Sequence, residues 1–211
     1  MAVKSSFKNM VLCLLAICFV CSALLAGVNV LTREPIERGR LAKTEKAVAA
    51  VLPPCNIVSE RQEIELDGVS YGYYAARQDD EFVGCAIESS TIGFGGVLSL
   101  MVGIAADGTI SGTQVLSHSE TPGLGAKCSD PAFSDQFKGW DSSVKKLAVR
   151  SSGGDVDAIT ASTITSRAYT LAVANAVRAF RDIDAVLNPD ASADGDAGEQ
   201  NEINEGGLTN E

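Results

Sequence analysis

Five hydroxyl side chains fall within seven consecutive positions near the C-terminal end of the chain. They are Thr160, Ser162, Thr163, Thr165 and Ser166. They directly precede a stretch with helical periodicity, and a helix N-terminus offers free backbone N–H groups and a partial positive charge. Small neighbours such as Ala161 allow a ligand to approach the backbone. Two interpretations remain open: a phosphate cradle, or an ordinary helix cap in which Thr165 or Ser166 caps the helix and the other hydroxyls are incidental.

A second polar segment, residues 117–125 with the sequence S-H-S-E-T-P-G-L-G, follows an expected strand. Glycine permits close approach and such loops often line ligand pockets, although a plain surface turn has the same composition. The single histidine, His118, stands two positions before Glu120, which predicts a local hydrogen bond rather than acid–base catalysis. A third segment, Gly93–Gly96, indicates a bend that enters a strand, and it is not a dinucleotide fingerprint because no GxGxxG opens a helix there.

Composition excludes several classes of site. With one histidine and no CxxC pair among six cysteines, the chain has no obvious ligands for a multi-histidine metal centre, a zinc ribbon, an iron–sulfur cluster or a c-type haem. Three of the cysteines lie in an apolar run near the N-terminus. The chain has 17 Lys and Arg against 27 Asp and Glu, a net charge of -10, which argues against nucleic-acid binding.

The elements that position these segments are antiparallel hairpins and helices. Residues 62–66 and 70–76 flank Asp67-Gly68, and residues 97–105 and 109–117 flank Asp107-Gly108, so two hairpins are predicted. Further strands are expected at 82–88 and 144–149, and a short helix at 131–138. A longer helix is predicted at 166–187 because its apolar residues recur every three or four positions: Tyr169, Val173, Val177, Phe180, Ile183 and Leu187. The predicted fold class is α+β, with antiparallel hairpins packed with helices.

The two ends of the chain differ from this core. Residues 9–32 contain no charge, and 24 residues at 1.5 Å rise span about 36 Å, enough for a transmembrane helix. The domain organisation predicted is a cytoplasmic N-terminus (1–8), a retained transmembrane helix (9–32), a helical stalk (33–54), a folded domain (55–187) and a disordered acidic tail (188–211). Two lysines precede the span and five basic residues follow it within 14 positions, so the positive-inside count favours a cytoplasmic C-terminal side.

Four segments taken in order resemble one family. They are G-F-G-G-V from Gly93, D-G-T-I-S-G from Asp107, H-S-E-T-P-G-L-G from His118 and D-A-I-T-A-S-T-I-T-S from Asp157. Together they are similar to the FMN-binding domain of the G subunit of the Rnf electron-transport complex. They are also similar to the related C subunit of the Na⁺-translocating NADH:quinone oxidoreductase. The resemblance extends from about residue 10 to residue 187 and includes the N-terminal anchor.

This resemblance implies covalent FMN, attached by a phosphoester to the threonine that ends an (S/T)-G-A-T motif. That motif maps onto Thr160, Ala161, Ser162 and Thr163, so Thr163 is the expected attachment residue, and Asp157 and Thr165 hold flanking positions. Ala161 stands where glycine is usual and Ser162 where alanine is usual. The loop expected beside the flavin consists of Glu120, Thr121, Pro122, Gly123, Leu124 and Gly125.

The function implied is that of an electron-carrier subunit of a membrane-bound, ion-translocating ferredoxin:NAD⁺ oxidoreductase, which is not catalytic alone. The implied partners are the other membrane and iron–sulfur subunits and a flavin transferase for maturation. The family places its domain on the extracytoplasmic side of the cell membrane, and we adopt that placement over the charge count. Alternatives are a flavoprotein like the C subunit of the NADH:quinone complex, or a membrane-tethered assembly module without flavin.

Overall fold

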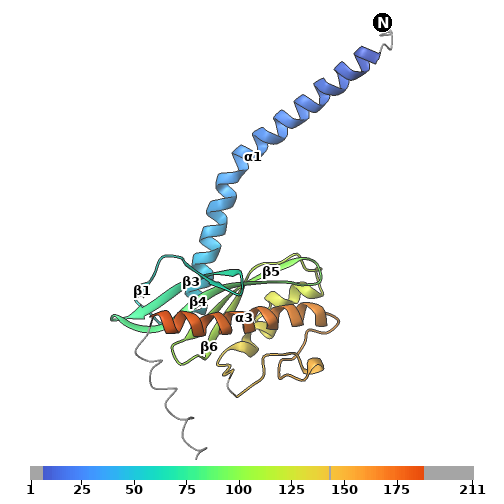
Figure 1. The fold of residues 1–211 in the computed structure, drawn as a ribbon. Helices are drawn as coiled ribbons and strands as arrows, with labels where there is room; N and C mark the ends of the chain where they lie inside the picture. The colour runs from blue at the N-terminus through green and yellow to red at the C-terminus, as the bar shows by residue number, and fades with distance from the viewer. Residues whose placement is uncertain (1–6, 143, 188–211) are drawn as a thin grey trace, which may run out of the picture. The chain divides into compact units, whose positions relative to one another are not determined.

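The computed structural model describes residues 7–142 and 144–187 (Figure 1). The chain divides into two compact units, residues 1–46 and 47–211, and helix α1 (Phe7–Val51) contributes to both. The predicted acidic tail, 188–211, and most of the predicted cytoplasmic N-terminus lie outside the described residues. Each unit is described by itself below.

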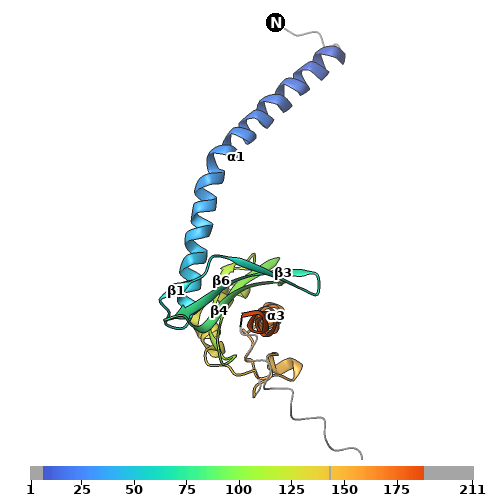
Figure 2. The same cartoon turned by 60° about the vertical axis from the view of Figure 1, so that its left-hand side comes forward.

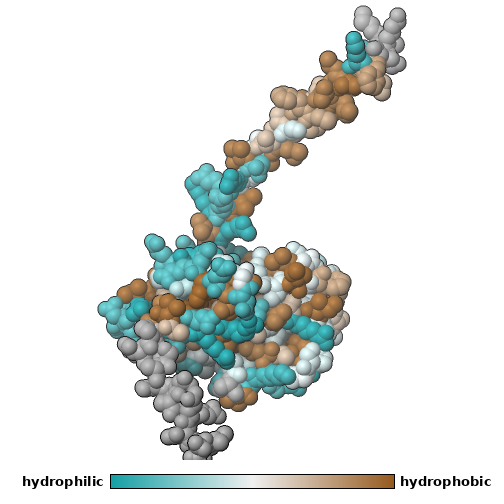
Figure 3. All heavy atoms as spheres, in the orientation of Figure 1, coloured by the Kyte–Doolittle hydropathy of each residue, from teal (hydrophilic) through white to brown (hydrophobic). Residues whose placement is uncertain are grey.

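The first unit consists of the apolar and then polar parts of α1. Within the described residues, α1 is the one helix long and apolar enough to cross a membrane. Its apolar side chains are exposed on all sides, for example Leu12, Phe19 and Leu25, and they form the brown segment of Figure 3. The predicted span and stalk form one helix here, which continues through Pro35. The boundary between span and stalk stays a prediction.

The second unit contains a six-stranded antiparallel sheet in the order β1-β3-β4-β5-β6, with β2 paired to β3. The strands are β1 (Ile57–Val58), β2 (Gln62–Leu66), β3 (Val69–Gln78), β4 (Glu81–Ile92), β5 (Val97–Ala105) and β6 (Ile110–Ser117). Both predicted hairpins are confirmed, as is the α+β class. The β4–β5 pairing continues in register from Gly84↔Ala105 to Ile92↔Val97, so the turn at Gly93–Gly96 is held at the end of two long strands.

Helix α3 (Thr163–Leu187) covers one face of the sheet, and Figure 2 looks nearly along its axis. The apolar stripe predicted from the sequence is confirmed, because Tyr169, Val173 and Ile183 are fully buried in the core with sheet residues such as Ile87 and Leu100. The helix begins three residues earlier than predicted. Thr165 and Ser166 therefore lie in its first turn, so neither caps the helix as one of the two interpretations of this segment required.

The other face of the sheet receives the end of α1. Ala47, Val48 and Val51 form a second buried cluster with Ala86 and Met101. The Ser111 hydroxyl donates a hydrogen bond to the Val51 carbonyl oxygen at 2.5 Å. The helix ends two residues before Pro53-Pro54, as the restriction on residues before proline predicts.

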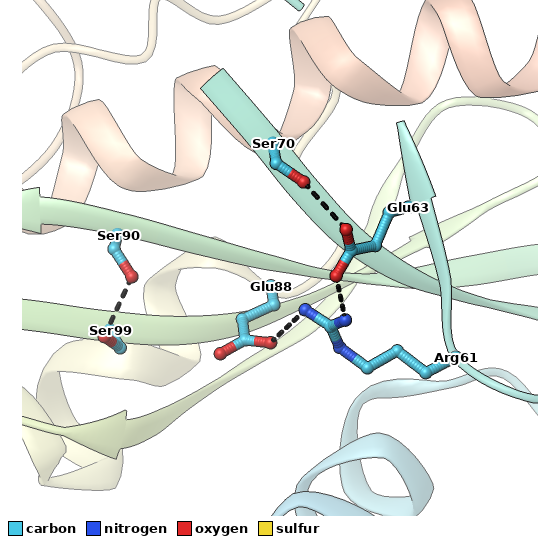
Figure 4. Close-up of polar contacts among 6 residues, drawn as sticks. All are labelled: Arg61, Glu63, Ser70, Glu88, Ser90 and Ser99. Carbon is cyan, nitrogen blue, oxygen red and sulfur yellow. Dashed lines mark hydrogen bonds and ion pairs between the residues drawn. The ribbon is translucent and has the colours of Figure 1, made fainter. Parts of the chain in front are cut away.

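A polar network lies farther along the same face (Figure 4). The Arg61 guanidinium pairs with Glu63 and, at 3.6 Å, with Glu88 of β4. The hydrogen bond from Arg61 lowers the pKa of the exposed Glu63 carboxyl. Arg61 crosses over Gly72, where a Cβ would lie 2.5 Å from its Nη2, so glycine leaves room for the guanidinium. The network joins the chain before β2 to the middle of the sheet.

The connection from β6 to α3 consists of short helical turns around an aromatic cluster. These turns are η1 (Gly125–Ser129), α2 (Pro131–Ser134), η2 (Asp135–Phe137) and η3 (Arg150–Ser152). The helix predicted at 131–138 is confirmed as the consecutive turns α2 and η2. Phe137 stacks on Tyr169 with ring centroids 5.2 Å apart, and the Tyr169 hydroxyl donates to Thr113 Oγ1 at 2.8 Å.

The strand predicted at 144–149 is wrong. The Val144 and Lys145 N–H groups bond back to the Asp141 carbonyl oxygen, which makes a turn, and the Val144 side chain is exposed. Only Val149 forms a bridge, with Val156. The apolar composition of this segment serves side-chain burial at Val149 rather than strand pairing.

Candidate functional site

A pocket of about 360 Å³ lies where three segments meet: the β4–β5 turn, the loop after β6 and the start of α3. It is lined by Phe94, by Glu120, Thr121, Leu124 and Gly125, and by residues 161–165. Two of the segments are thus the polar stretches that the sequence singled out. The volume is within the usual range for sites that bind small molecules and cofactors.

Most of the predicted site residues come together at this pocket. Of the hydroxyl motif and its flanking position, Ala161, Ser162, Thr163 and Thr165 line it, whereas Thr160 is exposed outside it. From the predicted loop, Pro122 and Gly123 are exposed and do not line it. The sequence assigned only a bend to the turn that carries Phe94. Phe94 stands between two glycines, and this pattern is the sequence signal that could have identified the turn as part of a binding site. In the structure its side chain lines the pocket and is 69 % exposed.

The start of α3 is shaped by a residue in the left-handed region. Ala161 has φ +61°, and the Ser162 N–H closes a turn onto the Ile159 carbonyl at 3.0 Å. The helical ladder then begins with the Ser166 N–H bonded to the Ser162 carbonyl at 3.0 Å. An L-residue in this conformation places its Cβ against the backbone, which glycine avoids. This is a physical reason for the glycine that the resembled motif carries at this position.

The hydroxyls of the motif differ in how they are engaged. Buried Ser166 donates to the Ser162 carbonyl and accepts the Ile159 N–H at 2.9 Å. Buried Thr165 donates to Glu120 Oε2 at 2.8 Å. The Thr163 side chain is half-buried at the first position of α3, and within the described part of the chain its hydroxyl makes no hydrogen bond. Thr163 is therefore a pocket-lining residue whose hydroxyl is available for other chemistry.

Glu120 joins the three segments at the base of the pocket. Besides the Thr165 hydroxyl, its carboxylate accepts the Gly95 N–H, at 3.3 Å to Oε1. A Cβ at Gly93 would overlap Oε1, and one at Gly125 would lie 2.5 Å from Oε2 and 2.7 Å from Thr165 Oγ1. The carboxylate thus occupies a slot that these two glycines leave open.

The expected local hydrogen bond of His118 is confirmed, and its partner is the backbone of Glu120. The Glu120 N–H donates to His118 Nδ1 at 3.2 Å.

Farther into the core, burial raises the pKa of the Cys128 thiol and of the Tyr169 hydroxyl. Among residues 7–142 and 144–187, no three His, Cys, Asp or Glu side chains gather to hold a metal ion. The chemistry available at the pocket is therefore that of a hydroxyl, a carboxylate and an apolar rim.

The comparisons with known proteins concern this region directly. Residues 93–178, which include every residue of the pocket, match a family model described as an FMN-binding domain. A solved structure of the C subunit of Na⁺-translocating NADH-quinone reductase from Parabacteroides distasonis is 27 % identical, covers 55 % of this chain and 63 % of that chain, and has a TM-score of 0.43.

Two curated relatives match most of the chain. The G subunit of an ion-translocating oxidoreductase complex from Methanosarcina acetivorans is 32 % identical, over 84 % of this chain and 96 % of that protein. The protein of the same name from Vibrio atlanticus is 35 % identical, over 76 % of this chain and 84 % of that protein. The chain therefore belongs to the family of G subunits of ion-translocating oxidoreductase complexes.

Proposed function

We propose that this chain is a membrane-anchored electron carrier whose FMN is held by a phosphoester to Thr163, and that it serves as a redox subunit of an ion-translocating ferredoxin:NAD⁺ oxidoreductase complex. A relative from Clostridium ljungdahlii, 29 % identical over 76 % of this chain and 84 % of that protein, is named for that reaction, with protons as the translocated ion. FMN supplies the redox chemistry, because no side chain of the pocket exchanges electrons readily.

The observation that carries the proposal is the position of Thr163. Thr163 lines the pocket as the first residue of α3, whereas the neighbouring Thr165 and Ser166 hydroxyls are already engaged in hydrogen bonds. The N–H groups of Thr163, Ile164 and Thr165 precede the first bond of the helical ladder, at Ser166. Such N–H groups bind phosphate oxygens well. These features fit a phosphoryl group at Thr163.

The apolar side chains around the pocket suit a ring that must remain accessible to redox partners. Phe94, Leu124 and Ile164 line the pocket and are 69 %, 45 % and 54 % exposed. Attachment through the phosphate leaves a flavin ring free to lie against these side chains. Their exposure then allows electron exchange with a neighbouring protein without opening the fold.

Covalent attachment would also reduce the electrostatic repulsion between the flavin phosphate and the Glu120 carboxylate. A phosphate monoester carries a charge of about -1.5 to -2 at pH 7. Its conversion to a diester on Thr163 leaves a single negative charge, which is repelled less by the Glu120 carboxylate at the same pocket. A tether further prevents loss of the cofactor outside the cytoplasm, where we place this domain. A separate flavin transferase would install it.

The remaining partners follow from the membrane anchor. The apolar part of α1 has no charged residue between Asn9 and Thr32, so it offers no ion path of its own. Other membrane subunits of the complex would move the ion, and an iron–sulfur subunit would exchange electrons with the flavin. Small residues of the span, such as Ala23 and Gly27, permit close packing against neighbouring helices.

The test is a pair of matched substitutions in the full chain, expressed with the flavin transferase. Thr163→Ala is expected to abolish covalent flavin fluorescence in denaturing gels while the protein still folds, because its side chain makes no hydrogen bond among the described residues. Ser151→Ala, which removes an exposed hydroxyl outside both the pocket and the motif, is the control and should retain fluorescence. Normal fluorescence in Thr163→Ala would refute the attachment site.

A further inference from the structure

Glu120 is the one charged residue among the buried side chains that the structure describes, at 6 % exposure. A buried carboxylate costs several kcal/mol unless hydrogen bonds or an opposite charge compensate it. Within residues 7–142 and 144–187, Glu120 takes part in no salt bridge, so its compensation comes from neutral donors. Two hydrogen bonds alone therefore compensate the charge of Glu120, at a position that lines the pocket.

Both carboxylate oxygens have a donor, and the donors come from different segments. Thr165 Oγ1 on the first turn of α3 donates to Oε2, and the Gly95 N–H in the β4–β5 turn donates to Oε1. Glu120 itself stands in the third segment, where its own N–H is fixed by His118. One side chain therefore holds the three walls of the pocket together.

The link to Thr163 runs through Thr165. The two residues lie in the same helical turn, so the hydrogen bond from Thr165 to Glu120 fixes the rotation of that turn and the direction in which Thr163 faces. The same bond keeps the Thr165 hydroxyl occupied, and Thr165 is buried whereas Thr163 is half-buried. The glycines at 93 and 125 leave the space that this arrangement needs.

We propose that Glu120 is a positioning residue of the flavin site: through Thr165 and the Gly95 N–H it holds Thr163 toward the pocket, and its charge makes reduction of the bound flavin harder. This inference rests on the proposed function. The charge part follows from electrostatics, because the buried negative charge of Glu120 at the pocket opposes the arrival of electrons on a flavin beside it. The positioning part follows from the two hydrogen bonds.

Two near-isosteric variants separate the positioning role of Glu120 from the effect of its charge. Glu120→Gln removes the charge and replaces one of the two acceptor oxygens by an NH2 donor, whereas Thr165→Val removes the hydroxyl and keeps the carboxylate. Glu81→Gln is the control, because Glu81 is an exposed carboxylate at the start of β4. The full chains are incubated with transferase and FAD, and the initial rate of covalent incorporation and the midpoint potential of the flavin are measured.

Glu120→Gln and Thr165→Val are each expected to slow incorporation about tenfold or more, the factor that corresponds to one hydrogen bond to a charged group. Because the two residues act as a pair, the double variant should be little slower than the slower single variant. The midpoint potential should shift to more positive values in Glu120→Gln and stay at the wild-type value in Thr165→Val. Glu81→Gln should change neither quantity.

Wild-type incorporation in Thr165→Val would overturn the positioning role, and this variant decides that question even if Glu120→Gln does not fold. An unchanged potential in Glu120→Gln, or an equal shift in Thr165→Val, would overturn the role of the charge. A wild-type chain that takes up no flavin would instead contradict the proposed function, so the two failures are distinguishable.

Discussion

At the scale of single residues, the site depends on which hydroxyls of residues 160–166 already take part in hydrogen bonds. The sequence placed five hydroxyls there, but it did not reveal that Thr165 is bonded to Glu120 and Ser166 to the backbone of Ser162. Those bonds join residues 45 and four positions apart, and the longer one could not be predicted from local patterns. The choice of Thr163 rested on the resemblance, and the pocket gives it a physical basis without testing it.

Ala161 provides a prediction at this scale. Its φ of +61° is a conformation that costs an L-residue about 1–2 kcal/mol, and glycine adopts it freely at some cost in unfolded-state entropy. Ala161→Gly should therefore raise the free energy of unfolding by up to about 1 kcal/mol, measured by urea denaturation of the full chain in detergent. Ala158→Gly, at an exposed position without positive φ, should lower it. A lower value for Ala161→Gly as well would contradict the left-handed conformation.

Two glycines of the loop that follows β6, Gly123 and Gly125, should respond differently to substitution by alanine. Gly125 is buried, and a Cβ there would press on both Glu120 Oε2 and Thr165 Oγ1, so Gly125→Ala should destabilise the protein by about 1–3 kcal/mol and slow flavin incorporation. Gly123 has open space but φ +78°, so Gly123→Ala should cost only about 1–2 kcal/mol of backbone strain and leave incorporation near normal. Thermal unfolding and incorporation rates check both. A greater loss of incorporation in Gly123→Ala than in Gly125→Ala would contradict the crowding expected at Gly125.

At the scale of elements, the sequence predicted what local periodicity controls. The hairpins around Asp67-Gly68 and Asp107-Gly108 and the apolar stripe of α3 were correct, because alternation and helical spacing follow directly from which face is buried. The segment 144–149 misled the prediction, since it is anchored by side-chain burial and turns instead of strand pairing. The start of α3 was predicted three residues too late. The turn before it depends on a positive φ at Ala161, and an alanine in the sequence does not indicate a positive φ.

Tyr169 gives the element-scale prediction, because it ties α3 to β6. Burial raises its pKa well above the ordinary value of 10, despite the opposing hydrogen bond with Thr113. The native state therefore holds the neutral phenol, so its stabilising contribution is complete below pH 10. That contribution is lost as pH rises above 10, because only the unfolded chain then ionises, by up to about 1.4 kcal/mol per pH unit.

Tyr169→Phe removes this dependence. The variant should be less stable than the wild type at pH 8 by about 0.5–1.5 kcal/mol, the value of the lost hydrogen bond. Its stability should then fall less steeply between pH 10 and pH 11. Urea denaturation at a series of pH values measures both quantities. Parallel curves for the two proteins across that interval would show that Tyr169 does not titrate as its burial requires.

At the scale of the whole molecule, the chain combines a helix long and apolar enough to cross a membrane with an FMN-binding domain. The apolar exposed part of α1 has no buried residue to stabilise it within its own unit, which fits a lipid environment. The sidedness of the domain stays a prediction, because the flanking Lys and Arg favour one orientation and the family resemblance the other.

A reporter fusion tests that orientation. Alkaline phosphatase fused after residue 187 should be active and green fluorescent protein fused there should be dark, because we place the domain outside the cytoplasm. Green fluorescent protein fused to the N-terminus of the full chain should be bright, because we place that end in the cytoplasm. A bright fluorescent protein after residue 187, with an inactive phosphatase, would mean that the positive charges after the span determine the topology.

Mass spectrometry of the intact protein shows whether FMN forms an ester with the hydroxyl at the first residue of α3. The full-length protein is purified from membranes of cells that contain the flavin transferase, and its intact mass is compared with that of the sequence. We expect an increment of one FMN less one water, located on the peptide that contains Thr163. A protein of unmodified mass from such cells, or an increment located on another residue, would contradict it.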